Sequence, residues 1–93
     1  PYGVMAVRAR SEDGQTVDGV ANFGLRPTVE DGATQPLLEV HLFDFSRSLY
    51  GQLLRVDMLH FLRPERRFDS FAALREQILA DASEARRLLS AQD

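Results

Sequence analysis

The chain has 93 residues, 44% of them hydrophobic and 27% charged, which is typical of one globular domain. Its net charge of −3 gives no electrostatic case for binding nucleic acid or an anionic membrane, and the lack of cysteine excludes a disulfide scaffold, a thiol nucleophile and a cysteine-ligated zinc site. No apolar run approaches the ~20 residues of a membrane span and no signal peptide is recognisable, so we expect a cytoplasmic protein.

The chain begins with Pro1 rather than methionine, and a strand-like run follows almost at once. We therefore expect residues 1–93 to form a single domain that comes from a longer chain and is truncated at its N-terminal side. A domain of this size buries a modest fraction of its surface, so the loss of one strand would lower its stability.

The first part of the chain predicts a β-hairpin. Val4–Arg10 alternates apolar and polar residues, as a half-buried strand does, and Asp13-Gly14 in the following turn is a strong hairpin signal. Thr16–Phe23 is the returning strand, in which Gly19 marks a bulge or bend.

Two further strands are expected after a loop over Gly24–Gln35, which is rich in turn-forming residues. Leu37–Phe45 is the first, and it alternates regularly. Its two faces carry Leu38, Val40 and Leu42 and, on the opposite side, Glu39, His41 and Phe43. Ser46–Gly51 then turns the chain into Leu53–Leu62. One side of that strand carries Leu54, Val56, Met58 and Leu62.

From Asp69 onward the hydrophobic period changes to that of a helix. Apolar residues recur three and four positions apart, which predicts a core-facing stripe of Phe71, Leu74, Ile78, Ala82, Ala85 and Leu89. Asp69 or Ser70 can cap the N-terminus of this helix. Four strands followed by one long helix predict a mainly β fold, a small barrel or curled sheet with the helix packed against it.

Glu39 is the first candidate for chemistry. It lies in mid-strand between apolar neighbours, and a carboxylate at the mouth of a barrel can act as a general base on a hydroxyl. The alternative is a solvent-facing glutamate without a chemical role, since glutamate is mostly exposed in proteins.

The charged turn Arg63–Arg67 is the second candidate, because it lies just before the helix. Arg63 or Arg66 can hold an anion, or Arg63 and Glu65 can hydrogen-bond the polar edge of a ring. The alternative is a solvated loop. Arg26 in the segment Asn22–Thr28 can reach a phosphate, although an ordinary loop explains that segment equally well.

The two histidines, His41 and His60, both lie on predicted strands. With Glu39 they would make an imaginable zinc site, but their spacing is unspecific. We therefore interpret both as structural or surface residues.

Four segments resemble those of riboflavin kinases, in that family's order and at about its spacing. They are the loop motif Gly19–Thr28, the strand Leu38–Phe45, the turn Leu49-Tyr50-Gly51 and the segment Leu62-Arg63-Pro64-Glu65 before the final helix. Each is weak alone, but together with Pro1–Val7 the resemblance covers nearly the whole chain.

The resemblance implies a six-stranded Greek-key β-barrel, the riboflavin-kinase-like barrel, with a long C-terminal α-helix. It also implies the kinase part of a bacterial bifunctional riboflavin kinase/FMN adenylyltransferase (FAD synthetase). That part transfers the γ-phosphate of ATP to the riboflavin 5′-hydroxyl to give FMN, with Mg²⁺ as cofactor. The implied partners are riboflavin, ATP and an N-terminal nucleotidyltransferase domain, with no nucleic acid and no membrane.

The resemblance also implies roles for single residues. Glu39 matches the family's catalytic glutamate and would accept the proton of the 5′-hydroxyl. Arg63 and Glu65 match a segment near the flavin, and Tyr50 matches a region near the nucleotide.

One segment of the family pattern is missing. The family's metal and phosphate site lies on an upstream Gly-x-Pro-Thr-Ala-Asn segment, and Pro27-Thr28 stands at the wrong place in the order to replace it. We therefore assign no metal ligand, and we expect the isolated chain to show little or no turnover. The alternative function is a non-catalytic flavin-binding or regulatory barrel that lost the metal and ATP segment.

Overall fold

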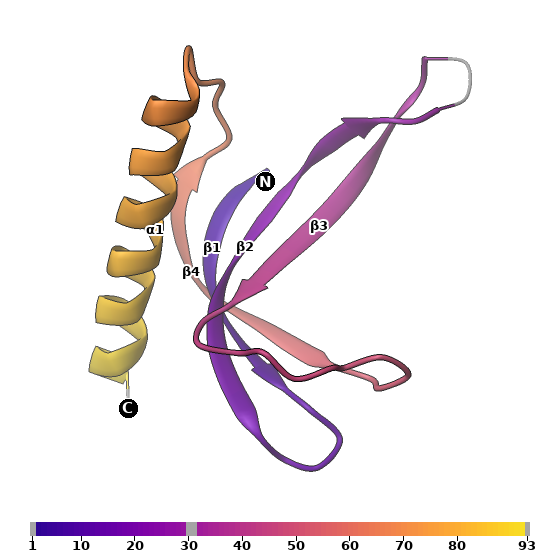
Figure 1. Ribbon diagram of the computed structural model, residues 1–93, viewed down its shortest axis with the longest axis vertical. Coiled ribbons are helices and arrows are strands. Elements are labelled where there is room, and N and C mark those ends of the chain that lie inside the picture. The colour runs from indigo at the N-terminus through magenta and orange to yellow at the C-terminus, as the bar shows by residue number, and fades with distance from the viewer. Residues whose placement is uncertain (1, 30–31, 93) are drawn as a thin grey trace.

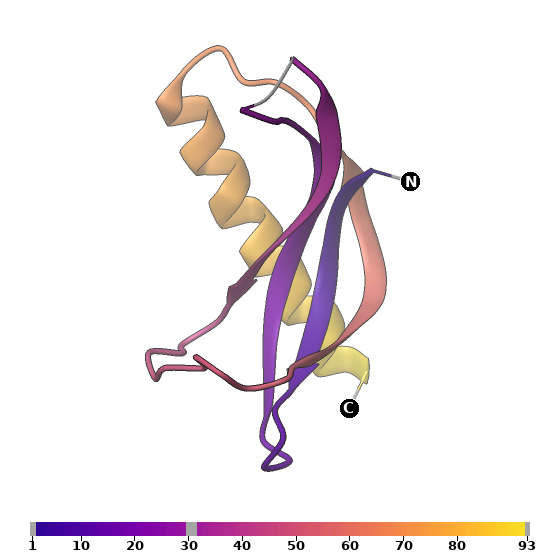
Figure 2. The ribbon, with the colours of Figure 1, turned by 90° about the vertical axis from the view of Figure 1, so that its right-hand side faces the viewer.

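The computed structural model describes residues 2–29 and 32–92. They form four strands and one helix (Figure 1), with the bounds β1 Gly3–Arg10, β2 Thr16–Pro27, β3 Thr34–Leu42, β4 Arg55–Pro64 and α1 Phe71–Gln92. The strands make one antiparallel sheet in the order β3-β2-β1-β4. The sheet is strongly twisted (Figure 2).

The predicted fold class, mainly β with a long C-terminal helix, is confirmed. The described strands do not close into a six-stranded barrel. They form an open sheet in which β3 and β4 are the two edges.

The hairpin between β2 and β3 is longer than predicted. Most of the segment Gly24–Gln35 was expected as a loop, yet β2 continues to Pro27 and pairs there with Thr34. Pro36 is tolerated because β3 is an edge strand, where a missing N–H group need not break a ladder on both sides. The predicted end of β3 at Phe45 is also wrong. The strand ends at Leu42, and the chain turns at Asp44, whose φ is 51°.

The helix packs on one face of the sheet. A cluster of buried residues joins Ala6 of β1, Phe43 after β3, and Ala85 and Leu89 of α1. Ser70 caps α1, because the amide of Ala73 donates to its Oγ at 3.1 Å. No helix in the described part of the chain has the length and apolar character needed to cross a membrane.

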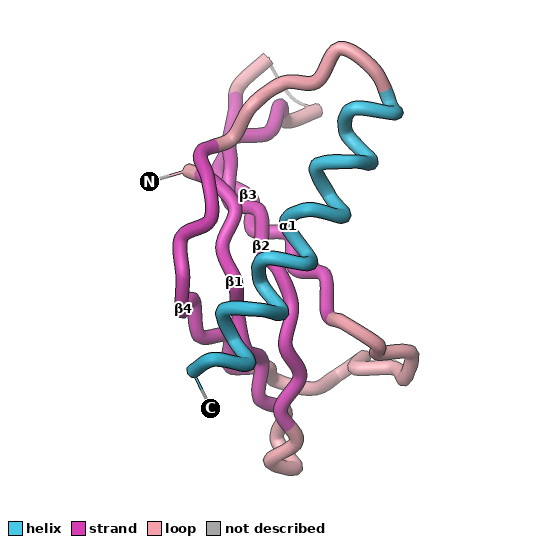
Figure 3. The backbone as a smooth tube through the Cα atoms, turned by 90° about the vertical axis from the view of Figure 1, so that its left-hand side faces the viewer, coloured by secondary structure: helices cyan, strands magenta, loops and turns pink. Residues whose placement is uncertain are grey.

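Only the C-terminal half of the predicted helix stripe is core. Ala85 and Leu89 are fully buried, but Phe71 is 90% exposed and Ile78 is 51% exposed, so their prediction as core residues is wrong. The reason is geometric. Figure 3 shows α1 crossing the strands obliquely, so that its N-terminal turns reach beyond the strands that its C-terminal turns cover.

The opposite face of the sheet is apolar, and no helix in the described part of the chain covers it. Met5, Val7 and Ala21 form its buried centre. Larger side chains that stay partly exposed flank this centre. Phe23 and Leu38 stand across from each other, Val40 stands across from Ala21, Met58 from Val7 and Phe61 from Met5.

The prediction of which β4 side chains share one side of the strand is also wrong, because of the strand register. A register shift opposite Ala6 and Val7 changes which side chains share a side of the strand. Val56 therefore packs on the apolar face without a helix, whereas Leu62 packs on the cluster under α1.

Candidate functional site

Glu39 lies on the face of β3 that looks toward the helix side of the sheet. It pairs in register with Asn22 of β2, and Phe43 on the same side of the chain packs into the cluster under α1. The predicted division of this strand into two faces is therefore confirmed. The Glu39 side chain is 55% exposed, so a ligand in solution can reach its carboxylate.

Arg26 of β2 joins Glu39 to a second carboxylate. Its Nη2 lies 3.1 Å from Glu39 Oε1, and its Nε donates to the same oxygen at 3.2 Å. Its Nη1 donates to Glu65 Oε1 at 2.9 Å and to the carbonyl of Leu25 at 3.1 Å. The hydrogen bond to Glu65 is the largest cause that raises the pKa of Arg26 above its ordinary value; the charges of Glu65 and Glu39 add to it and burial opposes it.

Gly24 makes room for Glu65. A Cβ atom at position 24 would collide with the Glu65 carboxylate group. The absence of a side chain in β2 therefore lets the segment after β4 come close enough for Glu65 to reach Arg26. The sequence analysis placed Gly24 at the start of a loop, but it lies within β2, where its observed role is this close approach.

Asn22 is the unusual polar residue of the site. Its Oδ1 is buried and, among buried side-chain nitrogen and oxygen atoms of the described residues, is the one without a hydrogen-bond partner. A buried acceptor without a partner normally costs stability. It stands directly across the strand pair from Glu39.

Arg63 and Glu65 are close in sequence but have different partners. Arg63 forms a two-pronged ion pair with Asp81 of α1, with Nε 3.0 Å from Oδ1 and Nη2 2.8 Å from Oδ2. Gln77 donates to the same carboxylate at 2.8 Å. The structure therefore brings Glu65 together with Glu39 through Arg26, while Arg63 is engaged with the helix. Flavin contact by Arg63 stays a prediction.

Sequence reasoning missed Asp81. The signal was present, because Asp81 stands four residues before Ala85 and therefore on the buried stripe of the helix. A charged residue at such a position needs a partner, and Arg63 is that partner.

Tyr50 lies apart from these residues. It is 96% exposed, in the turn between β3 and β4. No interaction in the described part of the chain joins it to Glu39 or Glu65, and its contact with a nucleotide stays a prediction.

The two histidines make ordinary contacts. His41 packs edge-on against Phe43 with ring centres 6.1 Å apart, and His60 lies 2.7 Å from Gln92. In residues 2–29 and 32–92 no three side chains of the metal-binding types His, Cys, Asp and Glu gather at one place.

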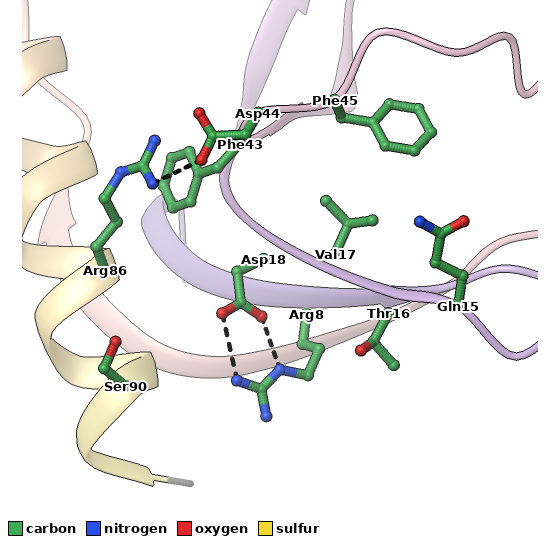
Figure 4. Close-up of a pocket in the computed structure, with 10 residues that line it drawn as sticks. All are labelled: Arg8, Gln15, Thr16, Val17, Asp18, Phe43, Asp44, Phe45, Arg86 and Ser90. Atoms are coloured by element: carbon green, nitrogen blue, oxygen red, sulfur yellow. Dashed lines mark hydrogen bonds and ion pairs between the residues drawn. The ribbon is translucent and has the colours of Figure 1, made fainter.

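A hollow of about 670 Å³ lies on the helix side of the sheet, near the hairpin of β1 and β2 (Figure 4). Two ion pairs cross its wall, Arg8 with Asp18 at 2.7 Å and Arg86 with Asp44 at 3.0 Å. In each of these two pairs an arginine meets one carboxylate, whereas Arg26 joins two carboxylates, and one of them belongs to Glu39, the first candidate for chemistry.

Comparison with known proteins agrees with the resemblance. The family model described as "Flavokinase: Riboflavin kinase" matches residues 1–89. A bifunctional riboflavin kinase/FMN adenylyltransferase from Haemophilus influenzae is 49% identical over 84 residues, which are 90% of this chain and 27% of that protein. An RNA-binding riboflavin kinase, RibR, from Bacillus subtilis is 42% identical over 82 residues, 88% of this chain and 34% of that protein.

A solved structure has the same fold. The crystal structure of a protein from Streptococcus pneumoniae described as a macrolide-efflux protein superposes with a TM-score of 0.72 at 32% sequence identity, over 86% of this chain and 25% of that one. The chain thus spans about a quarter to a third of the length of these relatives.

Proposed function

Because this chain belongs to the riboflavin kinase family, we propose that it is the kinase part of a longer bifunctional protein that makes FMN from riboflavin and ATP. The observation that carries the proposal is the exposed Glu39 carboxylate, held by Arg26 next to Glu65. In the longer protein an N-terminal domain would adenylylate FMN to FAD; support for this second activity is the name of the Haemophilus influenzae relative, a bifunctional riboflavin kinase/FMN adenylyltransferase. We expect this reaction to take place in the cytoplasm.

The proposed chemistry needs a proton acceptor. The 5′-hydroxyl of riboflavin is a poor nucleophile, and it loses its proton as its oxygen bonds to the γ-phosphorus of ATP and the bond to the ADP oxygen breaks. Glu39 accepts that proton, since its carboxylate is half exposed on an otherwise regular strand. Positioning of the two substrates supplies most of the remaining rate enhancement.

We propose that the flavin ring lies on the side of Glu65 and the nucleotide on the side of Tyr50. Support for the first is the Arg26 link from Glu65 to Glu39. Magnesium would neutralise the phosphate charge of ATP in the complete enzyme. No three His, Cys, Asp or Glu side chains gather at one place among the described residues, and we assign magnesium no step on this chain.

The test is Glu39→Gln in the full-length gene product. Loss of a general base should lower kcat for FMN formation by about 10²–10⁴-fold. The matched control is Glu84→Gln, which neutralises an exposed carboxylate that also pairs with an arginine, Arg87, on the helix. Glu39→Gln should still adenylylate FMN that is supplied to it. Normal phosphorylation of riboflavin by Glu39→Gln would show that Glu39 is not the base.

The same assay separates the alternative function. A non-catalytic barrel would quench riboflavin fluorescence on binding, yet the unmodified gene product would form no FMN from riboflavin and ATP. ATP-dependent FMN formation by the unmodified protein excludes this alternative.

A further inference from the structure

Arg26 contacts both carboxylates of the candidate site. Its guanidinium lies 3.1 Å from Glu39 and 2.9 Å from Glu65, and each contact uses a different nitrogen. The three residues come from β2, β3 and the segment after β4. One planar side chain thus spans three segments of the chain.

The residues around Glu39 show why its contact with Arg26 matters. On its own strand the neighbour on the same face is His41, and across the strand pair stands the uncharged Asn22. Arg63, two residues before Glu65, pairs with Asp81 of the helix instead. In the described part of the chain, the ion pair that holds Glu39 is therefore the one with Arg26.

A cation that pairs with two carboxylates fixes the position of each relative to the other. Without the cation, Glu39 and Glu65 would repel each other, and a half-exposed glutamate would sample several rotamers. The fork of an arginine can hold both at once, which the single ammonium of a lysine does less well.

We propose that Arg26 is a positioning residue that fixes the Glu39 carboxylate relative to Glu65, and so relative to the riboflavin 5′-hydroxyl. This inference rests on the proposed role of Glu39 as the base. It links recognition of the flavin at Glu65 to proton acceptance at Glu39 through one guanidinium.

The test compares Arg26→Gln and Arg26→Lys with the control Arg87→Gln in the full-length gene product. Arg87 is an exposed arginine that also pairs with a glutamate, Glu84, far along the helix. Misplacement of a catalytic group by about 1 Å can lower the rate by about 10²-fold. We expect Arg26→Gln to lower kcat by about 10–100-fold and to raise KM for riboflavin, with KM for ATP unchanged.

Arg26→Lys should recover part of the lost kcat, because it keeps the charge but not the fork. Arg87→Gln should match the unmodified protein. If Arg26→Gln does not fold, as judged by its melting curve, Arg26→Lys carries the test, with an expected kcat between those of the unmodified protein and Glu39→Gln. A kcat and a KM for riboflavin equal to those of the unmodified protein in either folded variant would overturn the inference.

A double variant separates positioning from general damage. If Arg26 acts through Glu39, then Arg26→Gln should lower kcat no further in a protein that already carries Glu39→Gln. An additional fall of the same size in that background would overturn the inference. A normal kcat in Glu39→Gln alone would instead remove the proposed base, which is a different result and cannot be confused with failure of the positioning role.

Discussion

Two of the arginine–carboxylate groups in the described part of the chain, one around Arg63 and one around Arg26, differ in burial and in the number of partners. Arg63 and Asp81 are 18% and 9% exposed and face each other with two parallel contacts. Arg26 and Glu39 are 33% and 55% exposed, and Arg26 divides its contacts between Glu39 and Glu65. A buried pair must stay intact because either charge alone is costly, whereas an exposed one contributes little to stability. We therefore expect the first group to hold the helix, and the second remains the one that we propose for chemistry.

The largest effect on stability should come from breaking the buried pair. Arg63→Met leaves Asp81 buried without its cation and should lower the free energy of unfolding by about 3 kcal/mol. Denaturant unfolding measures this, with Arg87→Met at an exposed pair as the control. Replacing both partners, in Arg63→Met/Asp81→Leu, should cost less than Arg63→Met alone. If Arg63→Met and the unmodified protein were equally stable, the buried pair would contribute no more to stability than the exposed group.

A smaller effect is expected at Gly24. The Cβ of Gly24→Ala would collide with the Glu65 carboxylate, which is the mobile end of a long side chain and can move aside. The loss of stability should therefore be at most about 1 kcal/mol, while KM for riboflavin rises because Glu65 leaves Arg26. In a Glu65→Ala background the collision has no partner, and Gly24→Ala should have no further effect on KM.

The smallest effect on stability should come from the exposed group itself. Glu39→Gln should change the free energy of unfolding by no more than about 0.5 kcal/mol, because the pair is half exposed. The same variant is expected to lose most of its kinase activity. A melting temperature several degrees below that of the unmodified protein would show that Glu39 has a structural role. The exposed group and the buried pair would then no longer differ in their effect on stability.

The sequence allowed prediction of what depends on local periodicity. The alternation over residues 37–45 correctly separated the side of Glu39 and Phe43 from the side of Leu38 and Val40. The helix and its cap at Ser70 were also predictable, because cap and period are local signals.

What depends on long-range geometry was not predictable. Arg26 and Glu65 are 39 residues apart, and their contact needs both the strand order and the open space at Gly24. Phe71 fits the helix stripe by spacing, but spacing does not reveal that the first turns of α1 reach past the sheet. The register shifts in β4 coincide with two adjacent apolar pairs, Met58-Leu59 and Phe61-Leu62, a break in the alternation that the sequence analysis did not use.

The position of β3 at the edge of the sheet has a consequence for the dynamics of Glu39. β3 is bonded to β2 alone, and most of its residues are exposed, whereas β1 is bonded on both sides and almost wholly buried. Local opening of β3 therefore breaks one ladder and exposes little apolar surface, so its free energy lies well below that of global unfolding. Arg26 of β2 contacts Glu39 of β3 across this sheet edge. A substrate that bound Glu39 would therefore slow the hydrogen exchange of the β3 amides without any change in the average structure.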